Sequence, residues 1–234
     1  MTSTIPPHVS PLAPRGFFVT GTDTGVGKTR VAVALIHALR ARGLRVAAMK
    51  PVSAGNVPGE LNEDVVALLQ AANVAADIRD VNPYAFAEPI APHIAAQQAG
   101  VRIELAAIAA AYARLAAAAD VVVVEGAGGW RVPLNEHEDM ADLAQRLGLP
   151  VVLVVGLRLG CLNHALLTAE SIANRKLPWA GWVGNAIEPA MGCQTENVAA
   201  LKARLPAPCL GIHSYQPNPV SMSDPPEWLV LPGL

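Results

Sequence analysis

Charged, aromatic and cysteine residues are all scarce in this chain of 234 residues. Asp, Glu, Lys and Arg make up 15% of it and apolar residues 52%, a balance typical of a compact globule and not of a disordered protein. The formal net charge of −2 gives no reason to expect binding to nucleic acid or to an anionic membrane surface. No apolar run reaches the roughly 20 residues of a membrane-spanning helix. We therefore expect neither nucleic acid nor a membrane as a partner.

The three cysteines form no CxxC pair, and an odd, sparse set is not a disulfide framework. Such a set indicates a reducing compartment, which predicts a cytoplasmic protein. Residues 1–15 carry four prolines and no apolar core, so they do not have the pattern of a signal peptide. We predict a disordered Pro-rich leader over residues 1–15 and a single domain over residues 16–234.

Short apolar β-type runs alternate with longer helical patterns along the chain. Strands are predicted at residues 16–20, 45–50, 121–125, 151–155, 180–185 and 209–212. Helices are predicted at residues 30–42, 63–71, 103–119, 140–147, 163–174 and 195–204. Strands that are apolar throughout are buried on both faces, and strand–helix repetition is typical of parallel sheets. We therefore predict an α/β fold, with a mostly parallel sheet flanked by helices on both faces.

A glycine-rich turn lies between the first predicted strand and the first predicted helix. It reads TGTDTGVGKT over residues 20–29. Its glycines let successive N–H groups wrap an anion, and the helix N-terminus adds a positive dipole end. Lys28 can reach the β- and γ-phosphates of a nucleotide, and the Thr29 hydroxyl can bind Mg²⁺. The turn therefore predicts a fold of the P-loop NTPase type, although Thr22 stands where the usual pattern has its first glycine and Gly21 lies one residue early.

Charged side chains also stand near the ends of other predicted strands, where parallel sheets bind ligands. Lys50 ends the second strand of a chain in which only four of the 17 basic residues are lysines. A compact ammonium can enter places that a guanidinium cannot. Glu125 ends the run VVVVE, a position typical of a metal-binding acid opposite a P-loop. Asp64 lies in the first turn of a predicted helix. Each of these three residues also has an ordinary interpretation as a solvated or capping side chain.

Cys161 and His164 lie near the start of a predicted helix and raise the possibility of a thiol nucleophile. No sequence signature supports that role, and a small buried residue is the simpler interpretation of Cys161. The histidines have no zinc-type spacing with the cysteines, so the sequence does not predict a zinc site.

Six segments, in order along the chain, resemble the dethiobiotin synthetase family, and they cover roughly residues 17–211. They are TGTDTGVGKT (20–29), KPV (50–52), NPYAFAEPIAPH (82–93), VEGAGGW (124–130), VVGLRLGCLNH (154–164) and GWVGN (181–185). The resemblance implies a seven-stranded parallel α/β fold, a homodimer, and Mg²⁺ as cofactor. It also implies that 7,8-diaminononanoate, CO2 and ATP give dethiobiotin, ADP and phosphate. The implied route passes through a carbamate and a carbamic–phosphoric anhydride.

The resemblance also implies roles for individual residues. The catalytic residues would be Lys50, Lys28 and Thr24, and the magnesium ligands would be Thr29, Asp64 and Glu125. ATP would contact Gly25, Val26, Gly27, Lys28, Thr29, Arg30, Asp64, Glu125, Gly126, Ala127, Gly128, Asn185 and Ala186, with Asn185 at the adenine. The substrate would contact Thr24, Lys50 and Ser53, and its carboxylate would be held across the dimer by Leu159, Gly160, Cys161, Leu162 and Asn163.

The sequence departs from the family pattern at three places. Ala54 stands where the family often has a serine, and Ser53 precedes it. Gly25 stands where some members have Glu. Residues 212–214 lack the usual proline, so the resemblance does not predict the contacts of the loop on the adenine side.

Two other functions stay open on the residues alone. One is another P-loop ATP-dependent ligase, such as the synthetase half of a cobyrinate amidase; that function would need a downstream glutaminase region, whereas the sequence ends at Leu234. The other is a non-catalytic P-loop switch ATPase that binds partner proteins. Partition-type ATPases carry an extra lysine early in the loop, whereas residues 20–24 contain none.

Overall fold

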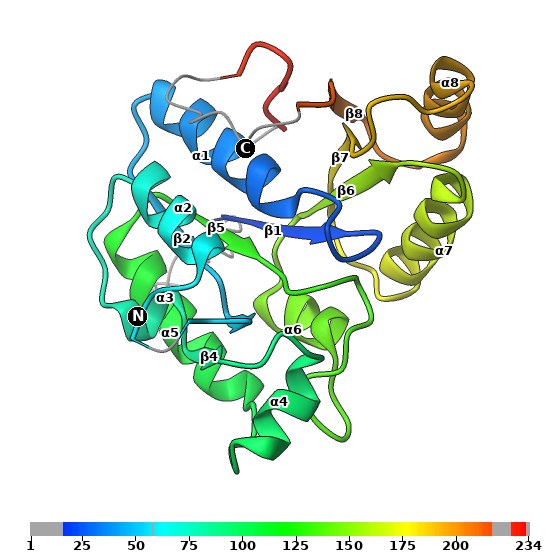
Figure 1. Ribbon diagram of the computed structural model, residues 1–234. Helices are drawn as coiled ribbons and strands as arrows, with labels where there is room; N and C mark the ends of the chain where they lie inside the picture. The colour runs from blue at the N-terminus through cyan, green and yellow to red at the C-terminus, as the bar shows by residue number, and fades with distance from the viewer. Residues whose placement is uncertain (1–15, 58, 217–225, 233–234) are drawn as a thin grey trace, which may run out of the picture.

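The computed structural model describes residues 16–57, 59–216 and 226–232, so the predicted leader lies outside the described residues. One six-stranded sheet forms its centre, with the order β2-β5-β1-β6-β7-β8 and parallel pairing throughout (Figure 1). The strands are β1 (Gly16–Gly21), β2 (Val46–Met49), β5 (Val121–Glu125), β6 (Val151–Leu157), β7 (Trp179–Ala186) and β8 (Cys209–His213). A separate parallel pair consists of β3 (Val52–Ala54) and β4 (Tyr84–Phe86).

Helices cover both faces of the six-stranded sheet (Figure 1). They are α1 (Lys28–Ala41), α2 (Glu63–Ala71), α3 (Ile78–Val81), α4 (Pro92–Gln98), α5 (Leu105–Ala118), α6 (Met140–Leu147), α7 (Cys161–Asn174) and α8 (Gln194–Arg204). Val123 of β5 packs with the apolar residues of α1, whereas its neighbour Val124 packs with those of α5 and α6. The prediction of an α/β sheet with helices on both faces is therefore confirmed. No helix in the described ranges is long and apolar enough to span a bilayer.

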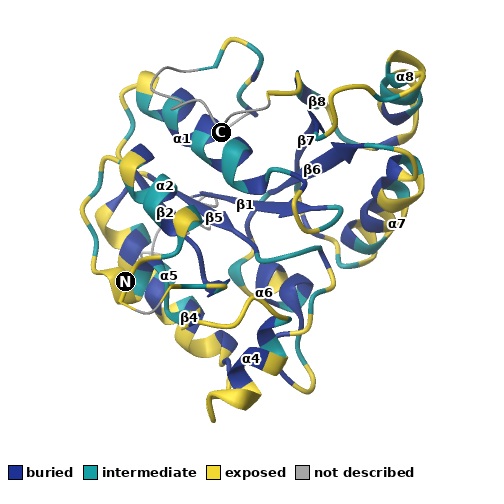
Figure 2. Cartoon of the chain, viewed as in Figure 1, coloured by how far each residue is buried: buried dark blue, intermediate teal, exposed yellow. Residues whose placement is uncertain are grey.

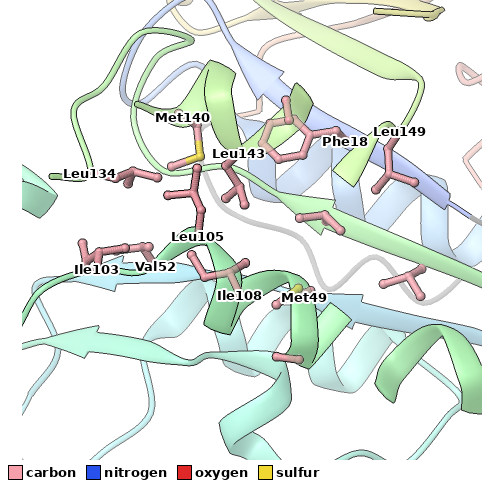
Figure 3. Packing of buried hydrophobic residues seen from close by; sticks show 14 of the residues in the cluster. Phe18, Met49, Val52, Ile103, Leu105, Ile108, Leu134, Met140, Leu143 and Leu149 are labelled. Carbon is pink, nitrogen blue, oxygen red and sulfur yellow. The ribbon is translucent and has the colours of Figure 1, made fainter. Parts of the chain in front are cut away.

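The core between the sheet and α5 and α6 is shown in Figure 3. Phe18 from β1, Leu105 and Ile108 from α5, and Met140 and Leu143 from α6 point toward one another there, and each is at most 2% exposed. Burying one such side chain contributes about 1.5–3 kcal/mol. The strands β1, β2, β5, β6 and β7 are buried almost along their whole length, while the helices alternate between buried and exposed faces (Figure 2). This packing gives the carboxyl ends of the strands a rigid support.

The seven-stranded sheet that the resemblance implied is wrong for the described residues, because the main sheet has six strands and the two further strands pair only with each other. The sequence analysis also missed β3, β4, α3 and α4. These four elements are between three and seven residues long, too short for a periodic pattern to develop. The predicted helix 30–42 begins earlier, at Lys28, and the predicted strand 45–50 ends at Met49, so Lys50 lies just beyond β2.

Strand order decides which strand ends lie next to each other. β1 lies between β5 and β6, and β5 separates β1 from β2. Glu125, at the end of β5, therefore stands between the loop that follows β1 and Lys50, which follows β2. The strand order thus places a carboxylate between Lys50 and the phosphate loop.

Candidate active site

The loop between β1 and α1 has the backbone of a phosphate cradle. Gly25 and Gly27 have φ values of +73° and +89°, which residues with a side chain rarely adopt. A Cβ on Gly27 would also lie 2.2 Å from the amide nitrogen of Asn185. Gly27 caps α1 without a side-chain hydrogen bond, so the first N–H groups of the helix stay available to an anion. The Lys28 ammonium donates to the Asp23 carbonyl at 3.1 Å, inside the loop.

Four polar side chains from α1, α2, β5 and the residue after β2 meet beside this loop. The Thr29 hydroxyl lies 2.6 Å from Asp64 Oδ1 and 2.9 Å from Glu125 Oε1. Lys50 Nζ lies 2.8 Å from Asp64 Oδ2 and 2.5 Å from Glu125 Oε1. Lys50 and Glu125 are 4% and 0% exposed. Two carboxylates, one hydroxyl and one ammonium are thus held together at the carboxyl edge of the sheet.

The acceptors of this cluster outnumber its protons. The Thr29 hydroxyl has one proton and cannot donate to Asp64 and Glu125 at once. Glu125 Oε2 is buried and has no hydrogen-bond partner among the described residues. A buried oxygen without a partner is costly, and a bound cation would remove that cost. Hard oxygen donors of this kind suit Mg²⁺, which takes one or two carboxylates from the protein and the rest of its shell from phosphate and water. No group of three or more His, Cys, Asp or Glu side chains could hold a metal within the described ranges.

Burial and charge act against each other on the ionisable groups of this cluster. Burial opposes the charge on Lys50, but Glu125 and Asp64 outweigh it and raise the pKa of Lys50. Burial raises the pKa of Glu125 even though Lys50 opposes the shift. Burial also acts on Asp64, where the charge and hydrogen bond of Lys50 outweigh it and lower the pKa. Lys28 is different, because burial and then the Lys50 charge lower its pKa to about 8.

Asp64 reaches the cluster because a local cap fixes the start of α2. The Asn62 side chain accepts a hydrogen bond from the Asp64 N–H at 3.0 Å, an ordinary N-cap. Asn62 also donates to Asn56 Oδ1 at 3.1 Å, which fastens the cap to the segment after β3. An Asn followed by two acidic residues was a readable helix-start signal, although it did not reveal that the second acid turns inward.

A cavity of about 710 Å³ opens beside the phosphate loop and contains most of the predicted site. The predicted residues that line it are Thr24, Gly25, Gly27, Lys28, Thr29, Lys50, Ser53, Asp64, Glu125, Ala127 and Gly128. Sequence reasoning assigned no role to a second set of lining residues, which are Val52, Ala54, Asn62, Pro89, Ile90, Ala91, Pro92 and Val132. Residues 89–92 belong to the segment 82–93 that carried the family resemblance, so that segment was a signal for them.

Asn185, at the end of β7, lies behind the phosphate loop and is 5% exposed. Its amide nitrogen donates to the Val26 carbonyl at 2.8 Å, and its Oδ1 lies 2.9 Å from His213 Nδ1. His213 also packs edge-on against Trp228, with the ring centroids 4.9 Å apart. Asn185, Ala186, Val26, Arg30 and Gly126 are not among the residues that line the cavity. The sequence did not reveal His213, which stands in the stretch that departs from the family.

The segment 159–163 does not line the cavity either. Leu159 is 94% exposed, while Cys161 is 2% exposed at the start of α7. The buried thiol agrees with the simpler interpretation of Cys161. Arg158, the residue before this segment, forms an ion pair with Asp23 of the phosphate loop. The chain thus ties the loop to the start of α7, although it does not bring residues 159–163 into the cavity.

Comparison with known proteins places this geometry in a family. A sequence profile described as "AAA domain" matches residues 15–222. The chain is similar to the "ATP-dependent dethiobiotin synthetase BioD" of Nitrosospira multiformis, with 55% identity over 87% of this chain and 90% of the relative. Proteins of the same name from Aromatoleum aromaticum and Pseudomonas aeruginosa are 51% and 55% identical, over 94% and 83% of this chain and 99% and 87% of their own lengths.

Solved structures with the same fold are more distant. The MinD cell division protein of Aquifex aeolicus, in complex with MinC, matches with a TM-score of 0.55 at 16% identity. The septum site-determining protein MinD of Pyrococcus horikoshii, in complex with Mg-ADP, matches with a TM-score of 0.53 at 16% identity. Each match covers 87% of this chain and 82% of the other. At this identity the likeness supports the P-loop NTPase fold alone.

Proposed function

The chain belongs to the ATP-dependent dethiobiotin synthetase family, and from this premise we propose how its residues carry out the reaction. The chain joins 7,8-diaminononanoate and CO2 at the expense of ATP, and gives dethiobiotin, ADP and phosphate. The supporting observation is the convergence of the phosphate loop, Lys50 and two carboxylates on one cavity. The two alternative functions, a switch ATPase and an amidase synthetase, do not explain why a dethiobiotin synthetase is 55% identical over 87% of this chain.

The reaction joins two anions, and the residues of the cavity suit that task. One amine of the substrate adds to CO2 and loses a proton, which gives a carbamate. A carbamate oxygen attacks the γ-phosphorus and ADP leaves; the second amine then attacks the carbamate carbon, and phosphate leaves as the ring closes. Lys28 holds the phosphates, and Lys50 offsets negative charge between the phosphate and the carbamate. Thr24 lies at the boundary between nucleotide and substrate, and the remaining contribution is positioning.

Thr29, Asp64 and Glu125 are the residues that would hold Mg²⁺. The Thr29 hydroxyl lies within hydrogen-bond distance of both carboxylates, and a cation would give Glu125 Oε2 the partner that it lacks among the described residues. When bound, Mg²⁺ would neutralise phosphate charge as a Lewis acid. The adenine would lie near Asn185, whose carbonyl and amide each keep capacity for one further hydrogen bond.

We also propose a cytoplasmic homodimer in which residues 159–163 of one protomer hold the substrate carboxylate of the other. Support comes from two exposed large apolar side chains, Leu159 just before α7 at 94% exposure and Leu167 within α7 at 58%. The N–H groups that open α7 suit a carboxylate for the same reason that those of α1 suit a phosphate. All three cysteines are free, as expected in a reducing compartment.

Turnover tests the proposed function directly. Phosphate release from ATP should require Mg²⁺, the diamine and CO2 together, because the cavity supplies charge stabilisation for an incoming carbamate and residues 20–29 of the phosphate loop include no recognisable water-activating residue. Phosphate release is measured with each component omitted in turn, and the ring product is followed by mass spectrometry. Equal hydrolysis with and without the diamine would sink the ligase function and favour a switch ATPase.

A second prediction concerns Lys28, whose pKa is lowered to about 8 by burial and by Lys50. A phosphate beside the ammonium favours its charged form and so raises that pKa on binding. Affinity for metal-free ADP should therefore be full below pH 8 and fall as the pH rises above 8, by up to about tenfold per pH unit. Calorimetry at pH 9 in two buffers of different ionisation enthalpy should register proton uptake. Lys28→Arg, which stays charged, should abolish that uptake, and uptake that persists in this variant would contradict the prediction.

A further inference from the structure

Ser53 lies on the wall of the cavity and belongs to β3, three residues after Lys50. It is 2% exposed, and its hydroxyl lies 2.9 Å from the side-chain oxygen of Asn82. Asn82 ends α3 and does not itself line the cavity. Of this hydrogen-bonded pair, Ser53 is therefore among the residues that line the cavity and Asn82 is not.

The orientation of the Asn82 amide is fixed by two backbone carbonyls. Its nitrogen donates to the Lys50 carbonyl at 2.6 Å and to the Tyr84 carbonyl at 3.2 Å. Carbonyl oxygens can only accept hydrogen bonds, so the NH2 group of the amide must face them, and both of its protons are used. The Asn82 oxygen is then left facing Ser53, and the flipped amide would set three oxygens against one another.

This orientation decides which way the Ser53 hydrogen bond runs. The Asn82 oxygen can only accept, so Ser53 must donate its single proton to it. The Ser53 oxygen then has only lone pairs to offer to the cavity. A ligand group at this point must therefore be a donor, and an oxygen of a carboxylate, phosphate or carbonyl would meet a second acceptor.

From this geometry we propose that Asn82 orients Ser53 so that the Ser53 oxygen accepts a hydrogen bond from an amino group of the diamine substrate. The inference rests on the proposed function, in which the diamine brings donor N–H groups at its two amines and a carboxylate at its far end. Ser53 would thus select the amine end for the Lys50 side of the cavity. Ala54, where the family often has serine, is half-buried in the same wall, so the acceptor in this chain comes from the preceding position.

Asn82 has a second consequence, because it also holds the residue that carries Lys50. Its bond to the Lys50 carbonyl and the bond from the Lys50 N–H to the Val81 carbonyl, at 2.8 Å, fix the backbone of that lysine from two sides. One side chain thus positions both the acceptor for the amine and the ammonium beside the carboxylates. Asn82 is a positioning residue here and not a catalytic one.

Binding of two ligands to two proteins tests the inference. The dissociation constants of 7,8-diaminononanoate and of nonanoate, which lacks both amines, are measured by calorimetry for the full chain and for Ser53→Ala. We expect Ser53→Ala to weaken the diamine about tenfold, the loss of one hydrogen bond to an amine, and to leave nonanoate unchanged. Ser171→Ala is the matched control, because it also removes a side-chain hydrogen bond, from Trp130, away from the cavity.

The outcomes separate the inference from the proposed function. If the parent protein shows diamine-dependent turnover and Ser53→Ala weakens both ligands equally or neither, the inference is overturned and the function stands. If the parent shows no such turnover, the function fails and the inference with it. Asn82→Asp adds a second readout, since a carboxylate cannot donate to the Lys50 carbonyl while Ser53 can still donate to it. Its kcat should fall about tenfold with a smaller loss of diamine affinity than in Ser53→Ala, and the reverse order would overturn the role of Asn82.

Discussion

Lys50→Gln is expected to lower kcat by about 100- to 1,000-fold while ATP still binds through the phosphate loop. Lys50 is the one ammonium that contacts both carboxylates of the cluster among the described residues, at 2.8 and 2.5 Å. We propose that during the reaction it stabilises the charge that develops between the γ-phosphate and the carbamate. A glutamine offers no charge there, so the chemical step should slow and nucleotide affinity should be nearly kept. Single-turnover rates and ATP affinity are the two measurements.

Lys50→Arg should not restore the rate. The lysine is 4% exposed and its ammonium contacts Glu125 at 2.5 Å and Asp64 at 2.8 Å, and a longer, planar guanidinium presents its charge in a different place and shape. Lys202→Arg and Lys202→Gln, on the exposed side of α8, are the controls and should retain parental rates. If Lys50→Arg works nearly as well as the parent, Lys50 supplies only general positive charge and its proposed role is wrong.

Glu125→Gln is expected to lower magnesium-dependent activity by at least about 100-fold with the fold preserved. The carboxylate is fully buried at the end of β5, where one oxygen contacts Lys50 and Thr29 and the other has no partner among the described residues. A neutral amide is a poor ligand for Mg²⁺, so the cluster should lose its affinity for the metal. Thr29→Ala should also lower magnesium-dependent activity, but by less, because it removes one neutral ligand.

The test is a magnesium titration of the initial rate, with the unfolding temperature measured alongside. Glu63→Gln is a matched control, since it neutralises an exposed carboxylate next to Asp64 on α2. The control should keep parental rates and the parental magnesium midpoint. Near-normal activity in Glu125→Gln would mean that the strand-end carboxylate is structural.

Several elements were determined by local sequence alone. The predictions for α2, β5 and α6 have the bounds that the structure has. In α2 and α6 the reason is an Asn or Asp cap that precedes a periodic apolar pattern, and in β5 it is an unbroken run of valines. The phosphate loop was equally readable, because its glycines, Lys28 and Thr29 act through backbone conformation within ten consecutive residues.

The residues of the cavity could be named from the sequence, but their contacts could not. Lys50 and Glu125 are 75 positions apart, and Thr29 and Glu125 are 96 apart. No local pattern records that β5 is inserted between β2 and β1, since strand order is set by how whole helices pack on the sheet. The same applies to Asn82, which looks like an ordinary residue before a proline and becomes a positioning residue only because α3 ends beside Lys50.

The sequence by itself thus determined the kind of chemistry, through residue types that bind phosphate and suit a hard cation, and through its resemblance to one family. Tertiary structure alone decided that Asp64 and Glu125 both contact the Thr29 hydroxyl, and that Glu125 Oε2 has no partner among the described residues. It also decided that the Ser53 hydroxyl donates to Asn82. The physical reason is that hydrogen-bond direction and burial depend on atoms brought together from distant parts of the chain. Residue type and local periodicity depend only on neighbours within a few positions.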